Sequence, residues 1–123
     1  MNYIMIIDDS ITIRAIVELV LKSQGFAVIH AENGVNALSK ISEIMEKGDD
    51  ISLCITDIDM PVMDGMTFLQ EFKKLYYYIP VIMLHTEAEE ILINECRELG
   101  ASHVLLKPFK PEILINAVKK LMR

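Results

Sequence analysis

Four charged side chains share one place in the sequence pattern, directly after a short apolar segment. They are Asp8, Asp9, Asp57 and Lys107. If the apolar segments are the strands of one parallel sheet, these side chains lie at the carboxyl ends of the strands, where such sheets bind their ligands. We therefore expect three carboxylates and one ammonium group to converge on one edge of the sheet.

Carboxylates that crowd together repel one another, and each raises the pKa of the others unless a cation is present. A divalent cation relieves this repulsion, and Mg²⁺ typically takes one or two carboxylates together with water and a phosphate. The formal charges of three carboxylates, one Mg²⁺ ion and Lys107 cancel, so a phosphate donor can approach the site. Because phosphoryl transfer depends mainly on positioning and charge neutralisation, these residues predict a Mg²⁺-dependent site for that chemistry.

The elements that must position these residues alternate along the chain. Short apolar segments, typical of parallel strands covered on both faces, alternate with amphipathic stretches of helical period. We expect strands at 4–7, 27–29, 51–56, 80–84 and 103–106. We expect helices after Ser10, from Asn33-Gly34, after Asp64-Gly65, over about 88–99 and from Pro111. This alternation predicts an α/β fold, in which one doubly wound, five-stranded parallel sheet carries five flanking helices.

Two side chains are interpreted as helix caps. Ser10 is a predicted N-cap of the first helix, and Asp64 is interpreted as the cap of the third helix rather than as a metal-binding acid. The first helix is expected to bury one stripe, formed by Ile13, Ile16, Val17, Val20 and Leu21.

Composition limits the class of protein. A chain of 123 residues with 52% hydrophobic and 24% charged residues is typical of one globular domain, here residues 1–123. The net charge of −6 argues against a nucleic acid partner. The apolar runs are far shorter than the roughly 18 residues of a membrane span, and no signal peptide pattern is present. We expect a soluble, cytoplasmic protein with no membrane partner, in which Cys54 and Cys96 are buried, unpaired thiols.

Three polar motifs of this chain resemble the receiver domains of two-component response regulators. They are Asp8-Asp9-Ser10, the nine-residue segment Asp57-Ile58-Asp59-Met60-Pro61-Val62-Met63-Asp64-Gly65, and Lys107-Pro108-Phe109. Their order and spacing agree with the family, and the segment from Asp57 is the most specific of the three. With Arg14 after the first motif, the pattern is most similar to stand-alone chemotaxis-type regulators. The resemblance implies a flavodoxin-like sheet of strand order 2-1-3-4-5 and, in many relatives, a cis bond before the proline.

The resemblance also implies the role of each site residue. Asp57 would accept a phosphoryl group from a partner histidine kinase, and Lys107 would contact the phosphoryl oxygens. Asp9 and Asp57 would bind Mg²⁺, for which Mn²⁺ could substitute, through their carboxylates, Asp59 through its backbone carbonyl and Asp8 through water. Phosphorylation would then remodel the surface of the fourth helix, fifth strand and fifth helix, which would bind a downstream protein. The protein would be a phosphoacceptor and not a turnover enzyme.

Two positions depart from the family pattern. Counting 22 residues back from Lys107 puts His85 where the family has a Ser or Thr, and Thr86 follows one position later. We favour His85 for that position and leave open which of the two contacts the phosphoryl group. Val104 lies where many relatives carry Tyr or Phe, which excludes an aromatic switch at this position.

Two other functions compete with this interpretation. Asp57-Ile58-Asp59 also fits the Asp-x-Asp core of haloacid-dehalogenase-type phosphatases, but no late acidic pair follows it. The other alternative is an interaction module that works without phosphorylation. The presence of every expected acid and of Lys107 argues against such a degenerate domain.

Overall fold

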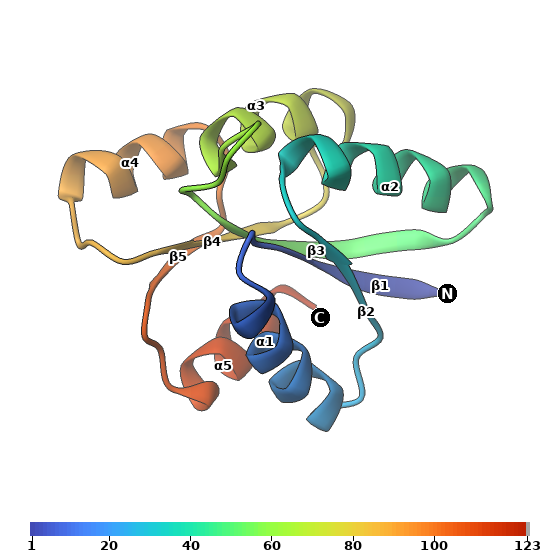
Figure 1. Cartoon of the computed structure of the whole chain (residues 1–123), viewed down its shortest axis with the longest axis horizontal. Helices are drawn as coiled ribbons and strands as arrows, with labels where there is room; N and C mark the ends of the chain where they lie inside the picture. Colours follow the sequence, from blue (N-terminus) through green and yellow to red (C-terminus); the bar gives the residue numbers. More distant parts are fainter. Residues whose placement is uncertain (123) are drawn as a thin grey trace.

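Five parallel strands alternate with five helices (Figure 1). In this computed structural model, which describes residues 1–122, the strands are β1 (Asn2–Ile7), β2 (Val28–Ala31), β3 (Asp50–Asp57), β4 (Val81–His85) and β5 (His103–Leu106). The helices are α1 (Ile11–Ser23), α2 (Gly34–Glu46), α3 (Gly65–Leu75), α4 (Glu90–Glu98) and α5 (Pro111–Leu121). The strands pair in the order β2-β1-β3-β4-β5, so both the predicted fold class and the predicted strand order are confirmed.

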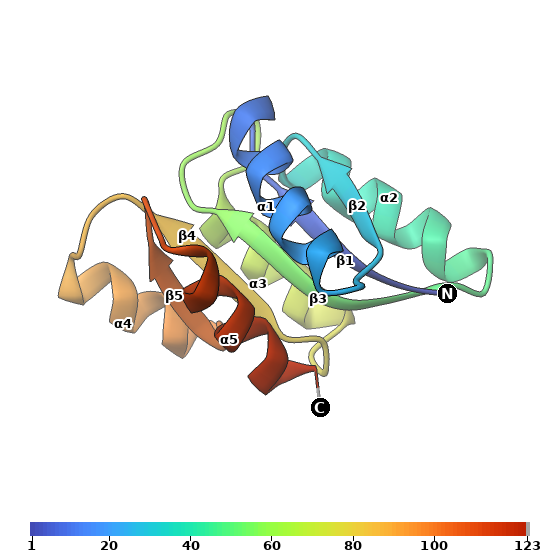
Figure 2. The same ribbon diagram turned by 90° about the horizontal axis from the view of Figure 1, so that it is seen from below.

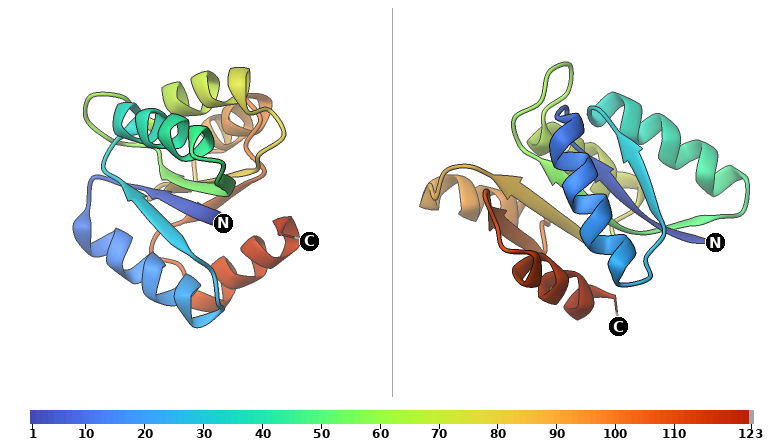
Figure 3. Two further views of the ribbon diagram at one scale, coloured as in Figure 1. Left: turned by 90° about the vertical axis from the view of Figure 1, so that its right-hand side faces the viewer. Right: turned by 60° about the horizontal axis from the view of Figure 1, so that its bottom comes forward.

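The helices form two layers, one on each face of the sheet. Helices α2, α3 and α4 cover one face, while α1 and α5 lie side by side on the other (Figures 1 and 2). Seen along the sheet, the strands are enclosed between these layers (Figure 3). The chain adds β2 on one side of β1 and β3 to β5 on the other, so the connections leave the carboxyl ends of β1 and β3 in opposite directions. A ligand crevice is expected at such a reversal.

The core explains why the strands are mostly apolar. In β1, Met5 and Ile7 pack on the side of α3 with Phe68, whereas Ile4 and Ile6 pack on the side of α1 and α5. Alternate side chains of a strand point to opposite faces, and both faces of this sheet are covered. The central strands are therefore mostly apolar up to the edge where the charged residues begin.

Local details differ from the sequence-based expectations. β1 begins at Asn2 rather than at residue 4, β2 is shifted to Val28–Ala31, and α4 is shorter than 88–99, spanning Glu90–Glu98. Ile16 was expected to face inward but is exposed. The buried side of α1 is centred between Val17 and Leu21, and a turn of about 100° per residue puts Ile16 about 120° away from that centre.

Several smaller expectations are confirmed. The Ser10 hydroxyl accepts a hydrogen bond from the N–H of Ile13, and the Asp64 carboxylate accepts one from the N–H of Thr67, so both side chains cap their helices. Cys54 and Cys96 are buried and unpaired. Within residues 1–122, no helix has the length and apolar character that a membrane crossing requires.

Candidate functional site

The charged residues singled out in the sequence lie at the carboxyl edge of the sheet. Asp8 and Asp9 follow β1, Asp57 is the last residue of β3, and Lys107 comes directly after β5. The strand register brings these ends level, since Ile7 pairs with Thr56 and Asp57 pairs with Leu84. Side chains that are distant in the sequence therefore meet where the strand order reverses, the place at which sheets of this kind form a ligand crevice.

Lys107 joins two of the carboxylates. Its Nζ lies 3.1 Å from Oδ2 of Asp8 and 3.1 Å from Oδ1 of Asp57. Asp8 and Asp57 are both buried, and Lys107 is half-buried. The other carboxylate oxygen of Asp8, Oδ1, accepts a hydrogen bond from the N–H of Ser10 at 2.9 Å, which orients the side chain. The lysine thus balances part of the negative charge and sets the direction of both carboxylates.

The protonation of this group follows from burial and mutual repulsion. Burial, and next the nearby Asp8 carboxylate, raise the pKa of Asp57 above its ordinary value, against the opposite effect of Lys107 and of the Ile58 N–H. Burial by itself lowers the pKa of Lys107, but the carboxylates of Asp57 and Asp8 outweigh it and raise the pKa overall. Lys107 is therefore positively charged at neutral pH, whereas ionisation of Asp57 in the metal-free site costs additional free energy.

The three carboxylates also meet the requirements of a hard cation. Asp8, Asp9 and Asp57 each offer one carboxylate oxygen, and these oxygens lie within 4.8 Å of one another. Asp9 is exposed, which leaves an open side for water or phosphate ligands. An all-oxygen donor set of this charge suits Mg²⁺ or Mn²⁺ rather than a metal that prefers thiolate or imidazole. The residues present therefore fit the implied ion.

His85 and Thr86 occupy very different surroundings. His85 is the last residue of β4 and is only 6% exposed, whereas Thr86 is exposed beyond the end of the strand. Within residues 1–122, the His85 Nδ1 has no hydrogen-bond partner, and the closest carboxylate oxygen to it is Oδ2 of Asp59 at 3.6 Å. The structure therefore offers a buried imidazole nitrogen beside the loop that follows Asp57.

Comparison with known proteins decides the family. The model of the response regulator receiver domain matches residues 4–119. The chain is a response regulator receiver domain. It therefore belongs to the proteins of two-component signalling, and the comparisons give no support to the phosphatase alternative.

Individual relatives agree with this assignment. The receiver domain is 31% identical to the chemotaxis protein CheY of Bacillus subtilis over 118 residues, which are 95% of this chain and 94% of that protein. It is 33% identical over 123 residues to a CpxR homolog of Haemophilus influenzae, a transcriptional regulatory protein of which the chain spans only 51%. Among solved structures, CheY4 of Vibrio cholerae superimposes with a TM-score of 0.88 at 32% identity, covering 98% of both chains.

A close backbone approach in this receiver domain was not foreseen from the sequence. Asp64-Gly65 was expected only to mark the start of the third helix, but the Gly65 N–H donates to the Ile58 carbonyl at 2.8 Å, and a Cβ atom at Gly65 would lie 2.1 Å from the Asp57 carbonyl oxygen. Only glycine leaves room for that contact, so the first residue of α3 fixes the backbone of Asp57. The Asp-Gly pair indicated where the helix begins, and nothing in it indicated this contact.

Two further contacts at the site also escaped the sequence-based reasoning. The Nη1 of Arg14 donates to the carbonyl oxygen of Asp8, and the Asp59 carboxylate lies beside His85. Neither Arg14 nor Asp59 lies at the end of an apolar segment, which was the signal that identified the other site residues.

The bond between Lys107 and Pro108 is cis, as the resemblance implied, and Val104 packs half-buried against the core beneath α3 and α4.

Val62, in the loop between Asp57 and α3, has a strained backbone. Its φ is +71°, although it is β-branched and 81% exposed. Left-handed backbone costs an ordinary L-residue about 1–2 kcal/mol, and asparagine tolerates it better than most residues. We expect Val62→Asn to raise the free energy of unfolding in urea by about 1 kcal/mol.

A matched control is Val35→Asn, which alters another exposed valine, in the regular backbone of α2. It should bring no gain in stability, because no strain is relieved there. If Val62→Asn also brought no gain, the positive φ of Val62 would cost the folded protein little free energy.

Proposed function

We propose that Asp57 accepts a phosphoryl group from a histidine kinase in a Mg²⁺-dependent reaction, with residues 1–123 acting as one receiver unit. The observation that carries this proposal is the position of Lys107, 3.1 Å from both Asp57 and Asp8 in a crevice whose three acids can share one cation. That arrangement neutralises the crevice for an incoming phosphate and leaves a carboxylate oxygen available for attack.

The hydrogen bonds of Asp57 suggest which oxygen reacts. Its Oδ1 already lies 3.1 Å from Nζ of Lys107 and accepts a hydrogen bond from the N–H of Ile58 at 2.9 Å. Oδ2 is then the nucleophile: it forms a bond to phosphorus while the bond from phosphorus to the imidazole nitrogen of the donor breaks. Lys107 stays close enough to contact the transferred phosphoryl oxygens. The site as a whole supplies mainly orientation and charge compensation.

The ion would be held by the residues of the acidic crevice. Asp9 and Asp57 would bind it through carboxylates, Asp59 through its backbone carbonyl and Asp8 through water, with Mg²⁺ as the natural ion and Mn²⁺ as a substitute. When bound, the ion stabilises negative charge on the phosphoryl oxygens. The exposed carboxylate of Asp59 is turned toward His85 and is not needed as a ligand.

His85, rather than Thr86, is proposed to contact the phosphoryl group. A buried nitrogen without a partner carries a free-energy cost that a new acceptor removes. The His85 Nδ1 is such an atom, and its strand neighbour Leu84 pairs with Asp57. The N–H of Lys107 donates to the carbonyl of His85 at 2.7 Å, so a movement of His85 reaches β5 directly.

The downstream partner would bind on the surface of α4, β5 and α5. This surface carries exposed apolar side chains from each of the three elements, namely Ile91, Leu106 and Ile113. Exposed apolar groups favour protein contacts. Phosphorylation would shift the population of this surface toward the form that binds the partner, through His85 and Lys107. In this role the domain is a phosphoacceptor and not a turnover enzyme, and we propose that it works in the cytoplasm.

The direct test is mass spectrometry after incubation with a small phosphodonor such as acetyl phosphate. One phosphoryl group should be added in the presence of Mg²⁺, it should map to Asp57, and it should be absent when EDTA removes the ion. Uptake at another residue, or uptake that is independent of divalent ions, would refute the proposed site. Continuous turnover of the donor without a phosphorylated intermediate would favour an enzyme.

The kinase is expected to contact the exposed stripe of α1, since a donor protein must cover the open side of the crevice. α1 starts just after Asp9, and Ile11, Ala15 and Leu19 follow one another at helical spacing on its exposed side. Leu19 is 74% exposed. We expect Leu19→Glu to slow phosphoryl transfer from the cognate kinase about tenfold or more, because it puts a charge into an apolar contact.

Transfer from acetyl phosphate separates docking from chemistry, and its rate should be unchanged in Leu19→Glu. The matched variant is Leu75→Glu, which alters a leucine of similar exposure (68%) at the far end of α3, away from the crevice. An equal slowing by both variants, or a slowing with acetyl phosphate, would contradict a docking role for α1.

A further inference from the structure

Two cations without carboxylate partners face one pocket at the outer edge of β2. The pocket has a volume of about 270 Å³ and lies between α1, the end of β2 and α2. Its lining residues are Arg14, His30, Ala31, Glu32, Asn36 and Lys40. Within residues 1–122, neither Arg14 nor Lys40 has a carboxylate within 4.0 Å, whereas Lys22 and Lys74 each have one and Lys107 has two. Two cations and one carboxylate line the pocket, a local excess of positive charge in a chain whose net charge is −6.

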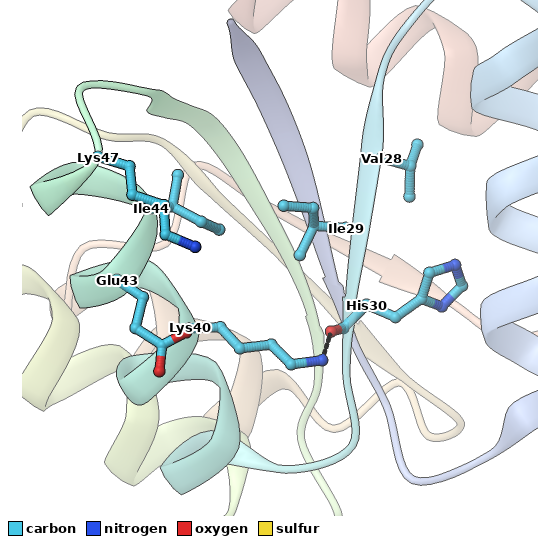
Figure 4. A pocket seen from close by; sticks show the side chains of 7 residues that line it. All are labelled: Val28, Ile29, His30, Lys40, Glu43, Ile44 and Lys47. Carbon is cyan, nitrogen blue, oxygen red and sulfur yellow. Dashed lines mark hydrogen bonds between the residues drawn. The ribbon is translucent and has the colours of Figure 1, made fainter.

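The polar groups of the pocket are mostly donors. The Nζ of Lys40, on α2, donates to the carbonyl oxygen of His30 at 2.6 Å. Figure 4 shows this hydrogen bond from the side of a neighbouring pocket, which is also lined by His30 and Lys40. Asn36 accepts a hydrogen bond from the N–H of Glu32 through its Oδ1, which leaves its amide N–H groups to donate. The imidazole of His30 points toward α1, where its Nε2 lies 3.1 Å from Glu18. The exposed carboxylate of Glu32 is the one acid in the lining.

Arg14 connects this pocket to the acidic crevice. Its Nη1 donates to the backbone carbonyl of Asp8, while its Nε is buried and has no acceptor among residues 1–122. The Nε donor of the Arg14 guanidinium is therefore left without an acceptor in this arrangement. If the guanidinium moved further into the pocket, Nε could meet an acceptor there, and the carbonyl of Asp8 would lose its donor.

We propose that this pocket binds a small oxyanion, the carboxylate or phosphate group of a small molecule, through Arg14, Lys40 and Asn36. Arg14 turns to bind the anion and releases the Asp8 carbonyl, which loosens the loop that carries Asp8 and Asp9. Anion binding and Mg²⁺ binding therefore oppose each other, and the effect is reciprocal because it is a coupling between two equilibria. The anion site stands by itself, whereas this coupling rests on the function proposed above.

The binding test uses the full chain in Mg²⁺-free buffer at constant ionic strength. Inorganic phosphate and succinate are titrated separately while amide signals are followed by ¹⁵N NMR, so that the two anion types are distinguished. We expect saturable shifts at Asp8, Glu32 and Asn36 with at least one of the two probes. Lys40→Gln should weaken that binding about tenfold, since it removes a charged donor.

The matched control is Lys47→Gln, which removes the same charge from the end of α2 but lies outside this pocket. Binding should be unchanged in it. Shifts that do not saturate, shifts centred on Asp57 and Lys107, or equal weakening in both variants would overturn the site. The NMR spectrum itself reports whether each variant is folded.

The coupling is tested by titrating Mg²⁺ with and without a saturating concentration of the anion that binds. We expect the anion to weaken Mg²⁺ binding about fivefold, and Arg14→Gln to remove the difference. An unchanged Mg²⁺ affinity would overturn the proposed coupling but would not affect the proposal of the anion site. Failure of Asp57 to take up phosphate would refute the proposed function without affecting the Mg²⁺-free titration.

Discussion

Asp57→Asn is expected to abolish phosphoryl uptake and, in Mg²⁺-free buffer, to raise the melting temperature. The amide cannot serve as the nucleophile, so mass spectrometry after treatment with acetyl phosphate and Mg²⁺ should find no added group. The gain in stability follows from the raised pKa of Asp57, because burial and Asp8 disfavour its ionised form. Excess Mg²⁺ should reverse the order of melting temperatures, since the ion then stabilises the wild type more.

The pH dependence gives this prediction a second readout. The pKa of Asp57 is raised above its ordinary value of 3.8, so the folded state binds this proton more tightly than the unfolded state does. The metal-free wild type should therefore lose stability relative to Asp57→Asn as the pH rises from 3.8 through the raised pKa. Asp64→Asn, which keeps a helix cap outside the crevice, should still take up phosphate. Uptake by Asp57→Asn, or a constant stability difference across pH, would contradict this account.

Gly65→Ala is expected to destabilise the fold by about 3 kcal/mol and to slow phosphoryl uptake. The new methyl group would lie 2.1 Å from the Asp57 carbonyl oxygen and 2.8 Å from the Cα of Ile58, both backbone atoms that cannot turn away. Either α3 or the end of β3 must shift, and the second movement displaces Asp57 from Lys107. Urea unfolding gives the stability, and uptake from acetyl phosphate gives the function.

The control for Gly65→Ala is Gly25→Ala. Gly25 has a φ of +85° but nothing within 4 Å of its added Cβ, so the substitution there costs about 1–2 kcal/mol from backbone strain alone. It is also remote from the crevice, so uptake should be normal. Equal losses of stability in the two variants, with uptake intact in both, would show that the close approach at Gly65 relaxes easily.

The sequence predicted the sheet and the acidic crevice because both depend on simple periodicities. Apolar side chains at every position from Ile4 to Ile7 indicated a strand covered on both faces, and Asp57 and Lys107 each came directly after another apolar segment. The carboxyl ends of parallel strands meet at one edge, so convergence followed from topology alone. The neutral charge balance then depended only on residue types.

Other features of the site depend on the path of the loops, which no short-range pattern encodes. The proximity of Asp59 to His85 arises from the loop after β3, and the positive φ of Val62 has no signal in its residue type. Arg14 lies in the first turn of α1, and its hydrogen bond to Asp8 depends on a long side chain folding back. Counting back from Lys107 indicated His85 for the position where the family has Ser or Thr, but only its burial beside an exposed Thr86 distinguishes the two.

The burial of both native cysteines has a practical consequence for studying the switch. Burial raises the pKa of Cys54 and of Cys96, which disfavours the reactive thiolate, and neither side chain is open to reagents. A single cysteine introduced at Ile91, which is 83% exposed on α4, should therefore react with a maleimide dye far faster than either native thiol. A fluorophore attached there would report movement of α4 in real time without removal of any native residue.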